Sequence, residues 1–164
     1  MPFVNADILA KQLHPEQPEQ YSYEAARIAE VMRQRFLRDG RTFCFETVFS
    51  HPSKIDFVAN AKALGYEIVL VFIHLEQLQL NLSRIAQRKS EGGHTVPDEK
   101  VKTRIPRVLQ LVKRVLPLCD QTYLLDNSCA DNPFQQIGVI RNGCLELKEV
   151  TVPTWCQELL ADYL

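Results

Sequence analysis

Carboxylate side chains follow two of the strand-like segments in this chain. Asp7 comes just after residues 3–5, and Glu46 comes just after Phe43-Cys44-Phe45. Asp7 could accept the proton of an attacking hydroxyl group or hold Mg²⁺, and Glu46 could contact a ligand or Mg²⁺. For Asp7 the alternative is to cap the helical turn that follows, because Asp is a common capping residue. For Glu46 the alternative is a structural ion pair with an Arg or Lys, because an unpaired buried carboxylate is costly.

Two pairs of arginines flank a loop that contains two glycines. The pairs are Arg84 with Arg88 and Arg104 with Arg107, and the loop covers residues 90–97. Spacings of four and three residues put each pair on one face of a helix. Guanidinium groups bind phosphate oxygens bidentately, so the arrangement predicts a lid over phosphates, and the alternative is a pair of solvated basic faces. His94 in the loop could contact a ligand or hydrogen-bond within the loop.

Strand-like and helix-like segments alternate along the chain. The strand-like segments are residues 3–5, 41–48, 66–75 and 121–125. This alternation predicts an α/β fold, with a parallel sheet and helices on both faces. The apolar run 68–73 is typical of a central parallel strand. Asn142 and Gly143 predict a C-terminal β-hairpin, and Pro153 precedes a short closing helix.

The polar residues that could form a site lie at the ends of these strands. Ligands of parallel sheets bind at the carboxyl ends of the strands. Asp7, Glu46, His74 and Asp126 each stand at such an end. We therefore expect the four side chains to meet in one crevice, although His74 is more typical of a residue that packs at a strand end.

Composition bounds the class of protein. The chain has 164 residues, which fits a single domain over 1–164, and its net charge of −1 gives no general attraction to nucleic acid or membrane. No apolar run approaches the length of a membrane span, and no signal peptide is evident, so we expect a cytoplasmic protein. The five cysteines lack metal-ligand spacing, and we expect no metal site and mostly buried free thiols.

An ordered set of motifs resembles a known family. The matching stretches are residues 4–10, 41–50, 61–66, 84–88, 92–97, 104–107 and 126–128. Together they cover nearly the whole chain and resemble the zeta toxin-like P-loop kinases, in particular the bacterial branch described as predicted ABC-type ATPases. The resemblance implies an ATP-dependent kinase that uses Mg²⁺ and phosphorylates a small acceptor. In zeta toxins that acceptor is UDP-N-acetylglucosamine, and an antitoxin protein is the expected partner.

The resemblance also implies a role for each candidate residue. Asp7 matches the catalytic carboxylate that activates the sugar hydroxyl, and Glu46 matches an acidic substrate-site residue with Thr47 beside it. Asn5 belongs to the same motif as Asp7 and is expected to bind substrate. The catalytic arginines of the lid map to Arg88 and Arg104, with Arg84, His94 and Arg107 as substrate-binding neighbours.

One family feature does not occur in the 164 residues. The P-loop pattern G-x-x-x-x-G-K-[ST], which holds the ATP phosphates, is absent. Family members carry a strand, the P-loop and a helix before the motif at residues 4–10, and that strand is central in their sheet. A longer native protein, a degenerate remnant or a rearranged sheet would each explain the difference. We expect little or no ATP turnover, and the alternatives are a non-catalytic binding module or a fragment without independent function.

Overall fold

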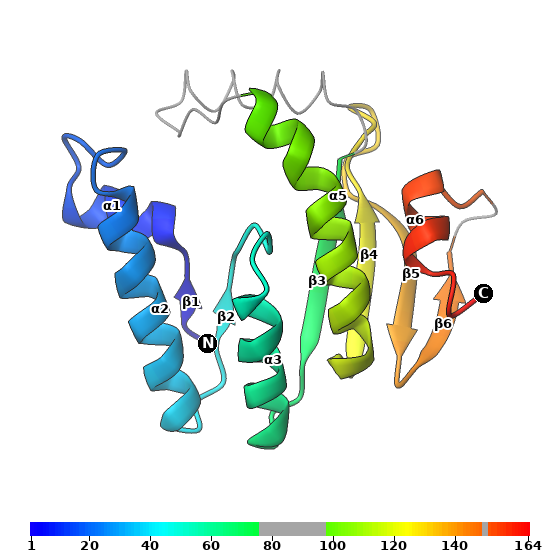
Figure 1. Ribbon diagram of the computed structural model, residues 1–164, viewed down its shortest axis with the longest axis horizontal. Coiled ribbons are helices and arrows are strands. Elements are labelled where there is room, and N and C mark those ends of the chain that lie inside the picture. Colours follow the sequence, from blue (N-terminus) through cyan, green and yellow to red (C-terminus); the bar gives the residue numbers. More distant parts are fainter. Residues whose placement is uncertain (76–97, 149–150) are drawn as a thin grey trace. The chain divides into compact units, whose positions relative to one another are not determined.

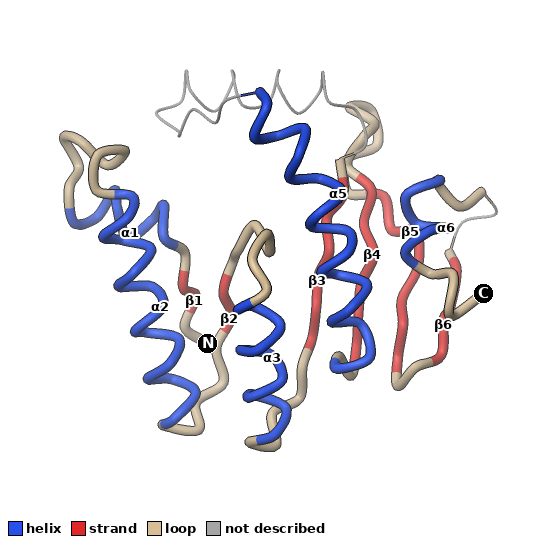
Figure 2. The backbone as a smooth tube through the Cα atoms, in the orientation of Figure 1, coloured by secondary structure: helices blue, strands red, loops and turns tan. Residues whose placement is uncertain are grey.

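The computed structural model describes residues 1–75, 98–148 and 151–164. They fall into two compact units, Met1–Val48 and Phe49–Leu164, and each unit is described by itself. Figure 1 shows the strands of both units as arrows, and Figure 2 shows them in red. None of the helices in these ranges is long and apolar enough to cross a membrane. That the whole chain forms one domain stays a prediction.

The first unit is a two-stranded parallel sheet with two helices. Its elements are β1 (Phe3–Val4), α1 (Ala6–Leu13), α2 (Ser22–Arg38) and β2 (Cys44–Phe45). Strand β1 pairs with β2, and the backbone amide of Glu46 extends the pairing by donating to the Val4 carbonyl at 3.1 Å. Because β1 leads directly into α1, the carboxyl ends of both strands lie where α1 begins. Helix α2 packs one face inward, formed by Ala25, Ala29, Arg33 and Leu37.

The second unit is a four-stranded mixed sheet with helices. Its elements are α3 (Ser53–Ala63), β3 (Val69–His74), α5 (Asp98–Val115), a 3₁₀ turn (Leu116–Leu118), β4 (Gln121–Asp126), β5 (Gln135–Arg141), β6 (Cys144–Leu147) and α6 (Thr154–Leu159). The strand order is β3-β4-β5-β6, with β3 and β4 parallel and the later pairs antiparallel. The predicted hairpin is confirmed: Asn142 and Gly143 have φ values of 49° and 79°, as a two-residue turn of this kind needs.

The apolar core of the second unit covers one face of this sheet. Phe72 of β3, Leu124 of β4 and Ile140 of β5 point into it. Helices α3, α5 and α6 supply the opposing side chains, including Val58, Val112 and Trp155. The strand face is apolar at alternate residues because successive side chains of a strand point to opposite faces.

Strand β3 lies at an edge of the described sheet, where a central strand was predicted. Its other face is open to solvent: Val69, Val71 and Ile73 are 53%, 54% and 48% exposed. The described strands thus form a two-stranded parallel sheet and a four-stranded mixed sheet, rather than one parallel sheet covered by helices on both faces. The prediction of a central strand failed because an apolar run indicates only that a strand is suited to burial on both faces. It does not determine which strands pair with its two edges.

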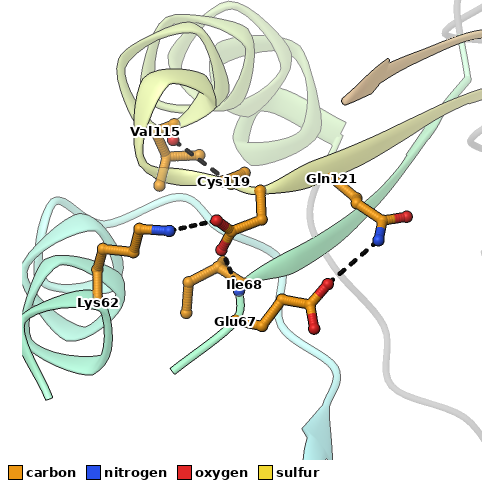
Figure 3. Close-up of polar contacts among 7 residues, drawn as sticks. Lys62, Glu67, Ile68, Val115, Cys119 and Gln121 are labelled. Atoms are coloured by element: carbon orange, nitrogen blue, oxygen red, sulfur yellow. Dashed lines mark hydrogen bonds and ion pairs between the residues drawn. The ribbon is translucent and has the colours of Figure 1, made fainter. Parts of the chain in front are cut away.

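Asp120 holds the amino end of β3 in place through Lys62 and Ile68, the two partners of its carboxylate, which are labelled in Figure 3. One carboxylate oxygen accepts a hydrogen bond from the Ile68 amide at 2.7 Å, and the other accepts one from Lys62 Nζ of α3. The Asp120 amide donates to the Ile68 carbonyl at 2.9 Å. The Ile68 amide, with help from Lys62, holds the pKa of Asp120 below its ordinary value. These contacts join α3, β3 and the start of β4.

Candidate functional site

Asn5 organises the carboxyl ends of β1 and β2. Its side-chain oxygen accepts hydrogen bonds from the amides of Asp7 and Ile8, at 2.8 and 3.0 Å, so Asn5 is the N-cap of α1. Its side-chain amide donates to Glu46 Oε2 at 2.7 Å. One side chain therefore joins the first turn of α1 to the residue that follows β2.

Asp7 is not the cap of α1, so the capping alternative drawn from the sequence is wrong. It lies one residue inside the helix, in the first turn, and its side chain is exposed. The unpaired amides and the dipole of a helix start favour a negative charge there. Among the described residues its carboxylate has no hydrogen bond or ion pair, so it is available to accept a proton or a hydrogen bond from a ligand.

Glu46 is exposed rather than buried, which corrects the expectation that it ends a buried strand. The physical reason is that β2 is only two residues long and Glu46 has already left it, although its backbone still pairs with Val4. Its structural partner is the neutral amide of Asn5, not an Arg or Lys. One carboxylate oxygen is thereby held in place while the group stays in contact with solvent. Thr47 follows and is half-buried.

A second polar cluster lies at the carboxyl ends of β3 and β4. His74 and Asp126 are register partners on the two strands, and both are buried. The ring of Trp155 of α6 lies tilted against that of His74, with centroids 4.4 Å apart, and its indole nitrogen donates to Asp126 Oδ2 at 2.9 Å. The Ser128 amide donates to the other oxygen of Asp126 at 2.7 Å. This contact was not predicted, because Trp155 is 29 residues from Asp126 and no local pattern links the two.

Burial sets the protonation of this second cluster. Removal from water lowers the pKa of His74 to about 4, although the charge of Asp126 acts in the opposite direction. Burial alone would raise the pKa of Asp126, but hydrogen bonds from Ser128 and Trp155 outweigh it and leave the pKa below its ordinary value. A neutral imidazole thus stands beside a charged, fully hydrogen-bonded carboxylate. His74 packs at a strand end as predicted, and the cluster has the character of a structural junction between sheet and α6.

The predicted lid is only partly within the described residues. Arg104 is half-buried and Arg107 is exposed, and both lie on α5 with the predicted three-residue spacing. Arg84, Arg88 and His94 lie outside the described residues. Closure of these arginines on phosphates therefore stays a prediction.

The structure brings together some of the predicted residues. Asn5, Asp7 and Glu46 share the first unit, with Asn5 in contact with the other two. His74 and Asp126 pair in the second unit. A single crevice that contains all of these strand ends stays a prediction. Within the described part of the chain, no group of three or more His, Cys, Asp or Glu side chains is placed to hold a metal ion.

The cysteines depart from their prediction. All five are free, and Cys44, Cys129 and Cys144 are exposed. Cys119 and Cys156 are buried, and burial raises their pKa values to about 11 and about 12. The expectation of mostly buried thiols fails because cysteine composition does not report which face of a strand each residue occupies.

Comparison with known proteins supports the fold. No protein-family model matches the chain. An uncharacterized protein of Haemophilus influenzae is 29% identical over 101 residues, which is 62% of this chain and 72% of that protein. A solved structure from the PezAT chromosomal toxin–antitoxin system of Streptococcus pneumoniae matches with a TM-score of 0.59 and 14% identity, covering 96% of this chain and 65% of that chain.

The structural match bears on the fold alone. At 14% identity it shows a similar fold and no more, and the chain spans just under two thirds of the structure it matches, 65%. Because the matched structure belongs to a toxin–antitoxin system, the similarity agrees in coarse terms with the zeta toxin-like fold that the motifs implied. Activity, acceptor and partners of this chain are matters for proposal.

Proposed function

We propose that this chain carries the acceptor-binding side of a zeta toxin-like kinase. The observation that supports it most is the side chain of Asn5, which caps the helix that bears Asp7 and holds the carboxylate of Glu46 at 2.7 Å. Two carboxylates at neighbouring strand ends suit a ligand rich in hydroxyl groups, because ionised carboxylates accept hydrogen bonds. The acceptor class is a small hydroxyl compound such as a nucleotide sugar, with UDP-N-acetylglucosamine as the reference ligand.

The proposed chemistry assigns one step to each group. Glu46 accepts hydrogen bonds from the acceptor and orients it. Asp7 accepts the proton of the acceptor hydroxyl as that oxygen attacks the transferred phosphoryl group, so that the proton ends on the Asp7 carboxylate. Arg88 and Arg104, from the predicted lid, would stabilise the negative charge on the phosphoryl oxygens. ATP would supply the phosphoryl group, with the bond from its γ-phosphorus to the bridging oxygen breaking and ADP leaving, and Mg²⁺ would offset the charge of the phosphates.

The same proposal predicts a weak or inactive enzyme. The sequence contains no P-loop pattern, the element that holds the ATP phosphates in P-loop kinases. We therefore expect binding of the acceptor without rapid consumption of ATP. Any antitoxin partner remains part of the proposal, since the matched structure comes from a toxin–antitoxin system.

Calorimetric titration tests this proposal. The purified chain is titrated with UDP-N-acetylglucosamine and, separately, with ATP and Mg²⁺, and ATP consumption is followed with both present. We expect the sugar nucleotide to bind and ATP turnover to be near background. Rapid ATP consumption that Asp7→Ala abolishes would overturn the inactive-enzyme part. Failure of the sugar nucleotide to bind would overturn the acceptor site.

A second candidate is a non-catalytic module that binds a protein partner. The observation in its favour is the exposed face of β3, where Val69, Val71 and Ile73 present an apolar row to solvent. On this candidate, Asp7→Ala and Arg104→Ala would leave the biological effect intact, whereas Val71→Lys would remove it. The two candidates therefore differ in which face of the chain is sensitive to substitution.

A further inference from the structure

Arg33 of α2 combines a buried side chain with an unpaired charge. It lies in line with Ala29 and Leu37 on the packed face of the helix and is only 8% exposed. Within the described residues its guanidinium makes no hydrogen bond and no ion pair. The guanidinium lies over the ring of Phe45, with its carbon 5.2 Å from the ring centroid. Buried charged groups in proteins are normally paired, so an arginine without an acceptor calls for an explanation.

The head of Arg33 nevertheless reaches solvent. Thr122 Oγ1 is the single side-chain nitrogen or oxygen atom in the described part of the chain that is fully buried without a hydrogen-bond partner. The guanidinium nitrogens of Arg33 also lack a partner, so they are not fully buried. Most of the side chain is therefore buried, while its guanidinium keeps some contact with solvent. Burial lowers the pKa of Arg33 but leaves the group charged at neutral pH.

The position of Arg33 relates it to the candidate acceptor site. Phe45, the ring beneath the guanidinium, ends β2, and Glu46 follows it with its side chain on the opposite face of this extended segment, so the two groups share the carboxyl end of β2 but not a face. Helix α2 follows α1, which starts at the carboxyl end of β1, and Figure 1 shows α2 returning alongside β1. Helical side chains incline toward the start of their own helix, which directs Arg33 toward the edge that carries Asn5 and Glu46.

We propose that Arg33 is an anion-binding residue of the acceptor site, which receives a phosphate, pyrophosphate or carboxylate group of the ligand. A planar guanidinium held against an aromatic ring offers two parallel N–H groups, which match two oxygens of such an anion. The acceptor is then a molecule with hydroxyl groups for Glu46 and Asp7 and an anionic group for Arg33. This inference rests on the proposed acceptor site for its ligand, but anion binding by Arg33 can be measured alone.

Glu30 offers the main competing explanation. It lies three residues before Arg33 on α2, and its charge acts on the guanidinium, yet the two groups are not within ion-pair distance. If Glu30 paired with Arg33 in solution, an added anion would gain little. Glu30→Gln removes that competitor, so it should strengthen anion binding if Arg33 is the receptor and leave it unchanged if Arg33 has no ligand.

The test uses the full chain and sodium pyrophosphate, an anion without hydroxyl groups. Binding is measured by calorimetry and by the NMR signals of the arginine Nε–H groups. We expect Arg33→Met to weaken binding by about tenfold or more, because hydrogen bonds to a charged group are lost. Arg33→Lys should give a smaller loss, and the matched control Arg38→Met, at an exposed position in the last turn of the same helix, should stay within about twofold of the wild type.

The outcomes separate this inference from the proposed function. Absence of pyrophosphate binding, or binding that Arg33→Met leaves unchanged, overturns the inference. A shift of the Arg33 Nε–H signal on titration of the wild type supports it without any variant, in case Arg33→Met does not fold. Binding of pyrophosphate through Arg33 without binding of UDP-N-acetylglucosamine would retain the anion site and reject that acceptor. Binding of the sugar nucleotide that Arg33→Met leaves unchanged would retain the acceptor site and reject Arg33 as its anion-binding residue.

Discussion

The two roles of Asn5 can be separated by two substitutions at the same position. Its side-chain oxygen caps α1 through the amides of Asp7 and Ile8, and its amide donates to Glu46 at 2.7 Å. Asn5→Ala removes both interactions. Asn5→Asp keeps an oxygen for the cap but sets a second carboxylate against Glu46. Adding Glu46→Gln to Asn5→Asp restores a hydrogen bond in the opposite direction, because the new amide at position 46 can donate to the new carboxylate at position 5.

The expected magnitudes follow from these contacts. Loss of an N-cap costs about 1 kcal/mol of helix stability. A hydrogen bond to a charged group contributes about 1.5–3 kcal/mol when shielded, but Glu46 is exposed, so we use about 0.5–1 kcal/mol. Asn5→Ala should therefore lower the free energy of unfolding of residues 1–48 by about 1.5–2 kcal/mol. Asn5→Asp should cost about 1 kcal/mol, and the double variant should recover to within about 0.5 kcal/mol of the wild type.

Hydrogen–deuterium exchange at the amides of Asp7 and Ile8 measures this directly, with urea unfolding followed by far-UV circular dichroism as the second readout. Faster exchange at both amides is expected in Asn5→Ala and near-native exchange in Asn5→Asp. Equal losses in the two single variants would show that the cap contributes nothing, and a near-native stability of Asn5→Asp would show that the bond to Glu46 contributes nothing. Lack of recovery in the double variant would show that positions 5 and 46 do not interact, and the proposed organisation of the site would be refuted.

Three further predictions concern the second unit and the thiols. Burial lowers the pKa of His74 to about 4, so between about pH 6.5 and pH 4 the unfolded chain binds a proton that the folded chain does not. The free energy of unfolding should therefore fall by roughly 3 kcal/mol as the pH drops through that window. In urea titrations at a series of pH values, His74→Gln should make this fall smaller. Asp120 has a lowered pKa, so its contribution to stability is present at neutral pH and is lost as the pH falls below the ordinary value of 3.8. Asp120→Asn should therefore have a lower urea midpoint than the wild type at pH 7, and the two midpoints should lie closer together near pH 3. Equal differences in midpoint at both pH values would contradict the assignment. A thiol reagent should modify Cys44, Cys129 and Cys144 in the folded chain and reach Cys119 and Cys156 only after unfolding, and rapid modification of all five in the native state would contradict the packing of α5 and α6.

The candidate site could be predicted from the sequence in its position but not in its contacts. Asp7 and Glu46 stand after short strands, as their neighbours in the sequence indicate. The sequence could not decide between Asn5 and Asp7 as the cap of α1, because both residue types cap well and helix starts are uncertain by a residue or two. The bond between Asn5 and Glu46 spans 41 residues, and no local pattern reports a contact of that separation.

The sheet shows the same limit. The run from Ile68 to Ile73 correctly predicted a strand that pairs in parallel, since β3 pairs with β4 over six residues. Its place at an edge was not predictable, because the neighbour of a strand depends on the rest of the chain. Likewise, Trp155 was assigned correctly to a short closing helix, but its hydrogen bond to Asp126 forms only when α6 packs on the sheet.

The most direct test of the acceptor site is the affinity of UDP-N-acetylglucosamine for the wild-type chain and for Glu46→Gln, measured by calorimetry in the same buffer. The substitution keeps the size of the side chain, and its amide oxygen can still accept from Asn5, so the fold should be retained. We expect the wild type to bind and the variant to bind about tenfold more weakly, since a charged acceptor is replaced by a neutral one. Equal affinities, or no binding by the wild type, would contradict the assignment of Glu46 to an acceptor site.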